Sequence, residues 1–509
     1  MAMTRRQALG AVVLATWVVV LGAHVRREYF RSDAVLLAEG ARMLAPGAHF
    51  FLVRLDDRVI GIASSRLDTI PGGFRFDDEL TLDVPALGEV HRTQARSSLE
   101  LDERLALQNF RFDLTSDIGT FAVRGAVEGD SALDLVLTSG GEPQRTRMPI
   151  DEQFLLSAMV PLRLAAAGAL AVGSEFTWDV FDPSAMASRA VTLRATARDT
   201  IVVSDSARLD ARGVWQVTLL DTVPVWRLEQ SFGGVTVVAY VDDDGQVVRE
   251  ESPLGYTIER TYYEIARQEW QASRQGPQLA SGYGAVIEGT AISSNVDLSD
   301  IAQRAQLAVR LGGVELTGFD LEGGRQQLRG DTLVITRESA GAADYILPYA
   351  AGGAIADELA ATPLIQARDP RIIAAARRAV GDTRDPREAA RRLNDWVYET
   401  LAKDITLSVP SALQVLEAEQ GDCNEHTVLY VALARALGLP ARTAVGLVHI
   451  RGRFYYHAWP EVWLGAWTAV DPTLGQFPAD ASHLRFLLGG LARQTELIRL
   501  IGRLQLEVV

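Results

Sequence analysis

The chain has 509 residues, of which 48% are apolar and 23% are charged. This is the composition of a globular protein, and it excludes a disordered, collagenous or coiled-coil chain. The length predicts about three domains. The net charge of −15 comes without a basic stripe, so we do not expect nucleic acid as a partner.

The first predicted element is an apolar segment over residues 7–25, which carries no charge unless His24 is protonated. As a helix it would span roughly 28 Å, close to the ~30 Å hydrocarbon core of a bilayer. Flanking arginines argue against a buried core helix, and residues 21–23 form a poor signal-peptide cleavage site. We therefore expect a single-pass anchor in the cell membrane. The orientation stays open: the arginine count, two before the run and three after it, slightly favours a cytoplasmic C-terminal side, whereas residues 4–9 resemble a twin-arginine export signal. Of the two, we favour a catalytic portion outside the cytoplasm.

Residues 33–275 are predicted to be rich in β-structure. Apolar and polar residues alternate in several segments, as in half-buried strands, and glycine-rich turns separate these segments. Strands that follow one another without long helices favour an antiparallel sheet. One helix is expected near residues 152–171, where apolar residues gather around Pro161. The clearest alternating segments are 51–55, 132–137, 214–219 and 235–241.

A smaller β domain is expected over residues 285–345. The best linker candidate before it is the stretch 274–277. Its clearest strands are residues 306–311 and 332–336, which alternate in the same way, and pairs of glycines mark turns between them.

The character of the sequence changes over residues 346–509, where helical spacing begins. Segments 370–379 and 386–401 each start with Asp followed by Pro. This pattern makes Asp369 and Asp385 the predicted N-caps, with proline at the first helical position. A third, shorter helix is expected just before the chain's single cysteine.

That cysteine, Cys423, lies at the start of a further predicted helix. A lone cysteine excludes an intramolecular disulfide and a cysteine-rich metal site, and it is more often a buried apolar thiol than a nucleophile. Apolar residues recur with helical period over 427–437, and Gly438 and Pro440 close the helix. At the helix N-terminus, the dipole and the free N–H groups stabilise a thiolate and a developing oxyanion.

A thiolate nucleophile needs a base, and the base needs an orienting partner. Residues 454–463 and 467–471 are predicted to form a hairpin that places Asp471 nearly opposite His457. Opposed Cβ atoms lie roughly 5 Å apart, so the carboxylate could accept a hydrogen bond from the imidazole. Alone, His457 would more often be structural and Asp471 a turn residue. Their order after Cys423, in plausible local structure, favours a catalytic triad.

These segments resemble the bacterial transglutaminase-like superfamily, a branch of the papain-like cysteine enzymes. The resemblance covers about residues 346–490 and rests on four segments: Gly421 to Cys423, 435–442, 457–462 and 467–473.

The resemblance implies a nucleophile at Cys423, a general base and acid at His457, and an orienting carboxylate at Asp471. It also implies a helix carrying the cysteine that packs on an antiparallel sheet carrying the other two residues. The expected fold class is therefore α+β: a transmembrane helix, antiparallel β-rich domains, and a transglutaminase-like catalytic domain over residues 346–509.

We expect a membrane-anchored enzyme that acts on protein or peptide amide bonds through a thioester, by hydrolysis or by transamidation, with no cofactor and no metal ion. The alternative is a non-enzymatic binding or scaffold protein of the cell envelope with a degenerate papain-like module. The β-rich half either presents a substrate or binds a partner, or it is a spacer.

Four nearby residues have weaker signals. His426 is favoured as a polar residue of the first helical turn over a second base or half of a metal site, because two ligands do not make a zinc site. Gln420 is a weak candidate for an oxyanion donor. Trp459 is favoured as a core residue over a substrate platform. His483 has no predicted role.

Overall fold

The computed structural model describes residues 33–509 except for the short segments 56–57, 87–88, 117–118, 130, 152–153, 254, 275–290, 340–342 and 405–408. The membrane anchor expected at residues 7–25 lies outside the described residues. Within the described part of the chain, no helix combines the length and the apolar character needed to cross a membrane.

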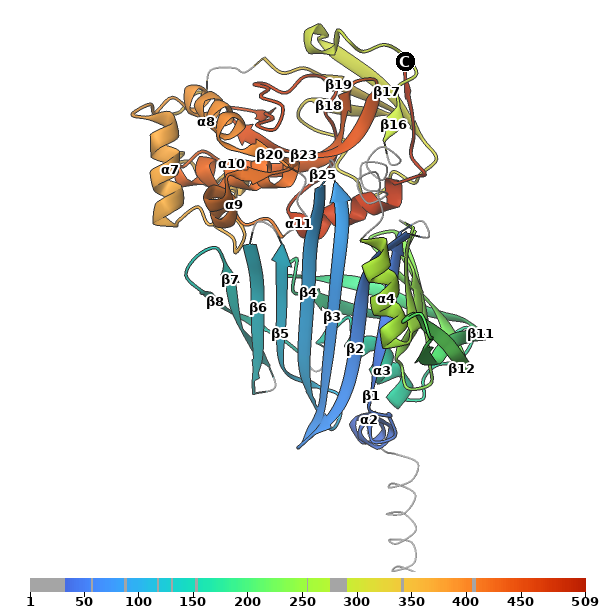
Figure 1. The fold of residues 1–509 in the computed structure, drawn as a ribbon. Coiled ribbons are helices and arrows are strands. Elements are labelled where there is room, and N and C mark those ends of the chain that lie inside the picture. The colour runs from blue at the N-terminus through green and yellow to red at the C-terminus, as the bar shows by residue number, and fades with distance from the viewer. Residues whose placement is uncertain are drawn as a thin grey trace, which may run out of the picture.

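A 15-stranded sheet forms the N-terminal half (Figure 1), in the order β8-β7-β6-β5-β4-β3-β2-β1-β15-β14-β13-β12-β11-β10-β9. Neighbouring strands are antiparallel except for β9 and β10, so the expected antiparallel β-structure is confirmed. The strands are β1 (Gly47–Leu55), β2 (Arg58–Ile70), β3 (Gly73–Ala86), β4 (Glu89–Asp102), β5 (Leu107–Ser116), β6 (Gly119–Glu128), β7 (Ala132–Ser139), β8 (Gln144–Pro149), β9 (Leu155–Leu156), β10 (Glu175–Asp182), β11 (Ala187–Leu209), β12 (Trp215–Phe232), β13 (Val235–Val241), β14 (Val247–Glu251) and β15 (Tyr256–Thr261).

The two halves of this sheet share one apolar core. Phe110 on β5 and Phe181 on β10 lie edge to face with ring centroids 6.2 Å apart, although many strands separate them along the sheet. Successive side chains of a strand point to opposite faces, so alternating sequences supply one apolar face for this core. Figure 1 shows the result: the blue and teal strands stand in front, and the green strands lie beside and behind them.

The helix expected near residues 152–171 is shorter than predicted. It is α3 (Met159–Ala166), because Leu155 and Leu156 instead form β9 beside β10. Pro161 lies in the first turn of α3, where a backbone N–H has no helical acceptor to lose. The other helices of this half are α2 (Asp33–Ala41) and α4 (Tyr263–Ser273).

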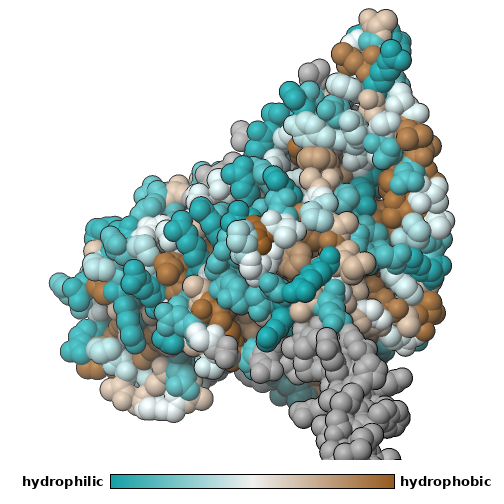
Figure 2. Space-filling view, turned by 90° about the horizontal axis from the view of Figure 1, so that it is seen from below, coloured by the Kyte–Doolittle hydropathy of each residue, from teal (hydrophilic) through white to brown (hydrophobic). Residues whose placement is uncertain are grey.

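The long hairpin of β11 and β12 carries apolar side chains on its surface. Figure 2 views the molecule from below and shows a mainly hydrophilic face with hydrophobic residues gathered along one edge. The exposed apolar residues of the hairpin are Val202, Leu209, Val217, Leu219 and Leu220.

The helices expected after residue 346 form where their caps predict. Asp369 accepts a hydrogen bond from the Arg371 N–H at the start of α7, and Asp385 accepts one from the Glu388 N–H at the start of α8. Both helices pack with α9 and α10 on one buried apolar cluster. The helices of this region are α6 (Ala354–Asp357), α7 (Pro370–Val380), α8 (Pro386–Thr400), α9 (Ala412–Ala418), α10 (Cys423–Ala436), α11 (Leu491–Gln494) and the 3₁₀ segment η3 (Thr495–Leu500).

A second sheet packs against α10, which is buried over most of its length. Its order is β16-β23-β22-β25, and β24 pairs with β23. The helix carrying the cysteine and the sheet carrying the histidine are thus in contact. The strands are β16 (Ile292–Ser293), β22 (Ala441–Ile450), β23 (Arg453–Trp463), β24 (Trp467–Ala469) and β25 (Leu484–Leu488), and a separate parallel pair joins β20 (Ala402–Lys403) to β21 (Gln420–Gly421).

The β unit expected at residues 285–345 includes a strand from outside that range. Its sheet has the order β18-β19-β17-β26, and the fourth strand, β26, comes from residues 505–508. Its core also continues into the second sheet, since Leu307 and Val309 belong to the same buried cluster as Leu447 and Phe454. Residue 345 therefore does not coincide with a break in packing. The elements are the 3₁₀ segment η2 (Ile301–Gln303), β17 (Gln306–Gly312), β18 (Gln326–Arg329), β19 (Thr332–Thr336) and β26 (Gln505–Val508).

Helix α9 joins the two halves of the molecule through Gln414. Its side chain accepts a hydrogen bond from the Ser139 hydroxyl at 3.1 Å and donates one to the Thr120 carbonyl at 2.6 Å. Gly140 lies against it with a positive φ of 67°, and an added Cβ there would lie 2.6 Å from the Gln414 side chain. Only glycine fits this close approach.

Candidate active site

Cys423 is the first residue of α10, as predicted. Its helix begins with a capping box: Asp422 accepts a hydrogen bond from the Asn424 N–H at 2.8 Å, and Glu425 accepts one from the Asp422 N–H at 3.0 Å. The two carboxyl groups satisfy backbone donors that a helix start leaves without partners. Sequence reasoning placed the helix here but did not identify this cap.

The cap leaves one N–H of the first turn without a partner among the described residues. The N–H groups of Asp422, Asn424 and Glu425 are occupied by the capping box, and the His426 N–H bonds to the Asp422 carbonyl. The N–H of Cys423 is the donor that remains. It lies at the positive end of the α10 dipole, next to the thiol.

His457 and Asp471 are hydrogen-bonded, with 2.8 Å between Nε2 and Oδ2. Both residues are buried. The other oxygen of Asp471 accepts hydrogen bonds from the N–H groups of Thr473 and Leu474 at 2.8 and 3.0 Å. The carboxylate therefore fixes the imidazole, and the second ring nitrogen, Nδ1, is the one that points away from Asp471.

The contact between His457 and Asp471 is formed by a different local structure from the predicted hairpin. In the register of β23 and β24, Trp463 faces Trp467 and Glu461 faces Ala469. A continued ladder would place Asp471 opposite Trp459, two residues from His457. The strand pairing instead ends at Ala469, and the side chain reaches His457 from the loop that follows.

The thiol of Cys423 lies beside the strand that carries the histidine. The backbone N–H of Ala458, the residue after His457, donates to the sulfur. Ala458 and Cys423 also pack in the same apolar cluster. The structure thus brings Cys423, His457 and Asp471 together at the contact of α10 with β23.

The electrostatic setting of Cys423 differs from the sequence-based expectation. Burial raises the pKa of the thiol well above its usual value, and the nearby carboxyl groups of Asp422 and Glu425 raise it further. The Ala458 N–H acts in the opposite direction. The pKa of Asp422 is itself raised by burial and by the adjacent Glu425. These surroundings favour the neutral thiol over the thiolate.

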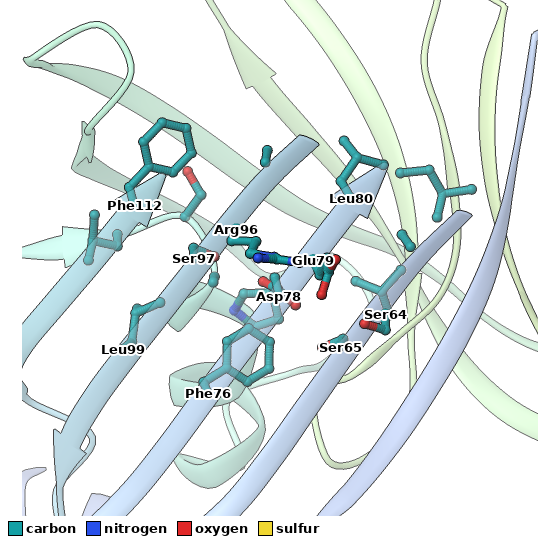
Figure 3. A pocket seen from close by; sticks show the side chains of 18 of the residues that line it. Ser64, Ser65, Phe76, Asp78, Glu79, Leu80, Arg96, Ser97, Leu99 and Phe112 are labelled. Carbon is teal, nitrogen blue, oxygen red and sulfur yellow. Dashed lines mark hydrogen bonds and ion pairs between the residues drawn. The ribbon is translucent and has the colours of Figure 1, made fainter. Parts of the chain in front are cut away.

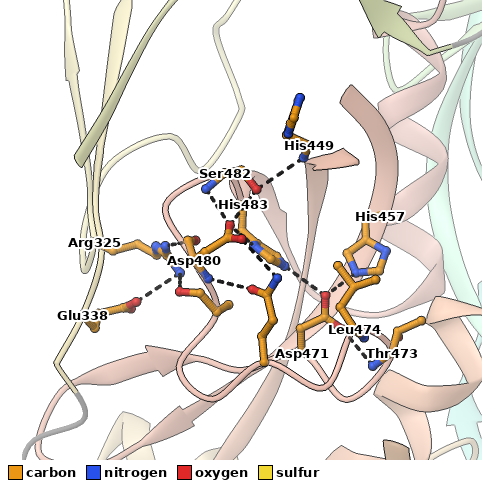
Figure 4. A network of polar contacts seen from close by, with 12 residues as sticks. Arg325, Glu338, His449, His457, Asp471, Thr473, Leu474, Asp480, Ser482 and His483 are labelled. Carbon is orange, nitrogen blue, oxygen red and sulfur yellow. Dashed lines mark hydrogen bonds and ion pairs between the residues drawn. The ribbon is translucent and has the colours of Figure 1, made fainter. Parts of the chain in front are cut away.

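His483, to which the sequence gave no role, is a fourth member of this cluster (Figure 4). Its Nε2 lies 3.0 Å from the same Asp471 oxygen that binds His457, and its Nδ1 lies 3.3 Å from Asp480. His483 is completely buried. A histidine with a carboxylate at each ring nitrogen holds its proton, because both nitrogens then act as donors.

The charges of this cluster stabilise one another. Burial opposes ionisation of Asp471, but His457 and His483 outweigh it and hold the pKa of Asp471 far below its usual range. Burial likewise opposes the charge of His483, but its bonds to Asp471 and Asp480 raise its pKa. The pKa of Asp480 is lowered in spite of burial, chiefly by His483.

The cluster continues into the β unit of β17, β18 and β19. Arg325 donates to the backbone carbonyls of Ala479 and Asp480 and pairs with Glu338 at 3.0 Å (Figure 4). The loop that carries Asp480 is therefore held by the residues before 345. The site depends on both parts of the C-terminal half.

His457, Asp471 and His483 are also the side chains here that could hold a metal ion, since their ligand atoms all lie within 4.8 Å of one another. The same atoms are already joined by the hydrogen bonds of 2.8 and 3.0 Å. These hydrogen bonds account for the short distances between the three side chains.

The remaining candidates have structural contacts. Nδ1 of His426 bonds to the Asp422 carbonyl at 2.7 Å, which anchors it to its own helix. Trp459 is fully buried, and its ring lies 6.1 Å from that of His457 and 5.1 Å from that of His483. It packs behind the histidines as a core residue. Gln420 forms part of β21, and its donor role stays a prediction.

Residues 373–472 match the family model of the transglutaminase-like superfamily. This part of the chain is thus a transglutaminase-like domain, and the resemblance predicted from the sequence is confirmed. The matched range includes Cys423, His457 and Asp471 but ends before His483.

Several similar proteins each align with part of the chain. The uncharacterized protein ML0607 of Mycobacterium leprae (strain TN) is 27% identical over 113 residues, which are 20% of this chain and 40% of that protein's length. A candidate cysteine protease of Cytophaga hutchinsonii aligns at 15% identity and a TM-score of 0.28, over 40% of this chain and 83% of that one. The periplasmic domain of TgpA from Pseudomonas aeruginosa, bound to ethylmercury, aligns at 16% identity and a TM-score of 0.22, over 37% of this chain and 98% of that one.

A further solved structure also aligns with part of the chain. It is a β-barrel-like protein of unknown function from Brucella abortus, with 11% identity and a TM-score of 0.30 over 43% of this chain and 95% of that one.

Proposed function

We propose that this protein is a cysteine enzyme that acts on amide bonds of proteins or peptides through a thioester intermediate. The observation that carries the proposal is the hydrogen bond of 2.8 Å between His457 and Asp471, next to the only cysteine of the chain. The transglutaminase-like match over residues 373–472 supports the same class of chemistry.

In the proposed reaction, His457 Nδ1 takes the proton of the Cys423 thiol as the sulfur attacks the substrate carbonyl carbon. A sulfur–carbon bond forms, the carbon–nitrogen bond breaks, and the imidazolium gives its proton to the departing amine. Asp471 keeps the ring oriented and stabilises its positive charge. Because the surroundings of Cys423 raise the thiol pKa, proton transfer and attack are coupled in this reaction.

The tetrahedral intermediate carries a negative oxygen that needs donors. The free N–H of Cys423, at the start of α10, is suited to this role, because the helix dipole and a fixed backbone donor both favour an anion there. Water or an amine then attacks the thioester. The proposal includes both outcomes, hydrolysis and transamidation.

We further propose that the apolar run of residues 7–25 anchors the protein in the cell membrane with its catalytic part outside the cytoplasm. The length of this run and its flanking arginines motivate the anchor, and the likeness of residues 4–9 to a twin-arginine export signal motivates the external placement. Membrane fractionation and protease accessibility of intact cells test this placement. A protein that is extracted by salt washing alone, or that is protected from external protease, contradicts it.

The catalytic proposal is tested with the full-length chain. Iodoacetamide labels a single thiol, so mass spectrometry reports Cys423 directly. Turnover is measured on a casein substrate as amine incorporation, ammonia release and peptide cleavage, which separates the possible reactions. Cys423→Ala and His457→Ala should abolish turnover, and the matched control His449→Gln, on β22, should retain it. Turnover that survives Cys423→Ala, or labelling that is unchanged by His457→Ala, contradicts the proposal and favours a binding module with an idle triad.

A further inference from the structure

A cavity of about 450 Å³ lies inside the 15-stranded sheet, in the half of the molecule that does not carry Cys423. This volume is in the range of small-molecule sites. Strands β2 to β5 form one wall, and strands β12 to β15 contribute to the other. Figure 3 shows the blue strands that carry the first wall, with the pale green strands beyond them.

One row of the first wall carries the carboxyl group of Asp78. The register places Asp78 on β3 directly between Ser65 on β2 and Ser97 on β4. The rows on either side are apolar: Phe76 pairs with Leu99, and Leu80 pairs with Ala95. Directly paired residues point to the same face of a sheet, so all of these side chains face the cavity. One carboxyl group thus lies within an apolar wall, and the small residues beside it leave the space open.

The other wall repeats this arrangement. Glu250 on β14 lies in a row between Ala239 on β13 and Ile258 on β15, and all three line the cavity. Among the described residues, no basic side chain pairs with Asp78 or Glu250; the Ser65 hydroxyl is the hydrogen-bond partner of Asp78. The two arginines of the lining pair with other carboxylates, Arg96 with Glu79 and Arg111 with Asp113. Asp78 and Glu250 thus face the cavity from opposite walls, and no ion pair among the described residues involves either of them.

Burial disfavours the ionised form of both carboxyl groups. It raises the pKa of Asp78 to about 7 and raises the pKa of Glu250 above its usual value. A carboxylate without a partner in an apolar environment is costly, and a cation at hydrogen-bond distance removes that cost. The apolar rows, in turn, would gain from contact with hydrocarbon.

We propose that this cavity binds an organic amine: a molecule with an apolar body and a positively charged amine that pairs with Asp78 and Glu250. This site is separate from the triad, and it does not depend on the chemistry proposed for Cys423. It assigns a ligand-binding role to the β-rich half.

Three probes with the same apolar body and different heads test the proposal: 4-phenylbutylamine, 4-phenylbutan-1-ol and 4-phenylbutyrate. Isothermal titration calorimetry with the full-length chain measures each affinity. We expect the amine to bind at least about tenfold more tightly than the alcohol, and the carboxylate to bind least. Because the amine favours the ionised form of Asp78, its binding near pH 6.5 should release protons, which repeated titration in buffers of different ionisation enthalpy detects.

Two charge variants and two matched controls locate the site. Asp78→Asn and Glu250→Gln should each weaken amine binding about tenfold and leave alcohol binding unchanged. Asp77→Asn and Glu251→Gln change the neighbouring carboxylates on the same strands, which do not line the cavity, and should retain wild-type binding. Ala95→Phe, which fills the cavity, should abolish binding of all three probes.

The proposal is overturned if the alcohol or the carboxylate binds as tightly as the amine, or if none of the three binds. It is also overturned if the amine binds without proton release near pH 6.5. These measurements on the unaltered protein decide the question even if a variant fails to fold. Turnover at Cys423 is recorded in parallel, so that failure of this proposal is distinct from failure of the catalytic one.

Discussion

The two halves of this protein surround carboxyl groups with opposite environments. Asp471 is surrounded by two imidazoles and two backbone N–H groups, and its pKa is held far below the usual range. Asp78 and Glu250 lie in an apolar cavity, and burial raises their pKa values. Asp471 is completely buried and Asp78 and Glu250 are half-buried, yet it is Asp471 whose pKa is lowered, because the fold supplies it with partners.

The site around Asp471 has all its charge partners within the protein, whereas the cavity around Asp78 and Glu250 does not. Around Asp471 the chain supplies every charge that the carboxylate needs, so the cluster is fixed before substrate arrives. Asp78 and Glu250 have no cationic partner among the described residues, and a positively charged ligand could supply one. The same substitution should accordingly have opposite effects in the two halves.

The largest effect is expected for Asp471→Asn. The amide cannot balance the charge of His483 and does not hold the His457 tautomer, so turnover should fall by at least about 10³-fold and the free energy of unfolding by about 3–5 kcal/mol. Asp78→Asn at pH 8 should leave the free energy of unfolding unchanged or raise it by about 1–3 kcal/mol, since it removes an uncompensated charge. Urea unfolding measures both variants. If Asp471→Asn and Asp78→Asn lowered the free energy of unfolding equally, the proposed difference between the two carboxyl environments would be wrong.

A smaller effect is expected for His483→Gln. The variant removes a positive charge beside Asp471, and the free energy of unfolding should fall by about 2–3 kcal/mol at pH 6. Because the pKa of His483 is raised in the folded protein, this contribution is fully present below about pH 6.5 and is lost as pH rises through the raised value. The difference between wild type and variant should therefore shrink at alkaline pH.

Turnover distinguishes positioning by His483 from stabilisation alone. His483→Gln should lower kcat about tenfold and move the acidic limb of the pH–rate profile upward, because the carboxylate then acts on one imidazole only. The matched control His449→Gln should change neither quantity. An unchanged pH–rate profile in His483→Gln would assign it a purely structural role.

The raised thiol pKa of Cys423 gives a third prediction. Because burial and the carboxyl groups of Asp422 and Glu425 raise the thiol pKa, the rate of alkylation should rise with pH to a midpoint above that of a free thiol. Glu425→Gln should lower this midpoint by removing one of these charges. A midpoint below about 8.5 in the wild type would mean that the helix dipole and the imidazole outweigh burial.

The smallest effect is expected where the two halves meet. Gln414→Ala leaves the Thr120 carbonyl and the Ser139 hydroxyl without their partner, and it should cost about 1–3 kcal/mol in the free energy of unfolding. Glu417→Ala, on the exposed side of the same helix, loses only its ion pair with Arg371 and should cost less than about 1 kcal/mol. Thermal unfolding of both variants checks this difference, and equal shifts in Tm would place the interface energy elsewhere.

The parts of the fold that the sequence predicted are those with local causes. The Asp-Pro pairs predicted the starts of α7 and α8, and strand alternation located four strands of the large sheet, β1, β7, β12 and β13. The position of Cys423 at a helix start followed from the period of the residues after it. Each of these signals lies within a few residues of the structure it specifies.

The parts that the sequence did not predict depend on distant contacts. His483 reaches Asp471 because the loop after Asp471 folds back and is held by Arg325. The residues next to His483 in the sequence do not indicate this contact. The strand β26 pairs with β17, about 200 residues away in the sequence, which is why the expected domain boundary at residue 345 divides a single core. The expected contact of His457 with Asp471 formed, but through a loop rather than the continued ladder.

The position of β26 has a consequence for the order in which the protein matures during synthesis. The 15-stranded sheet is complete in the nascent chain by residue 261, and residues 373–472 follow it. The sheet that contains β17 receives its fourth strand only after residues 505–508 have emerged from the ribosome. Arg325 belongs to that sheet's unit and holds the loop beside the triad. Cys423 is therefore synthesised before the last strand of the unit that holds the loop beside it.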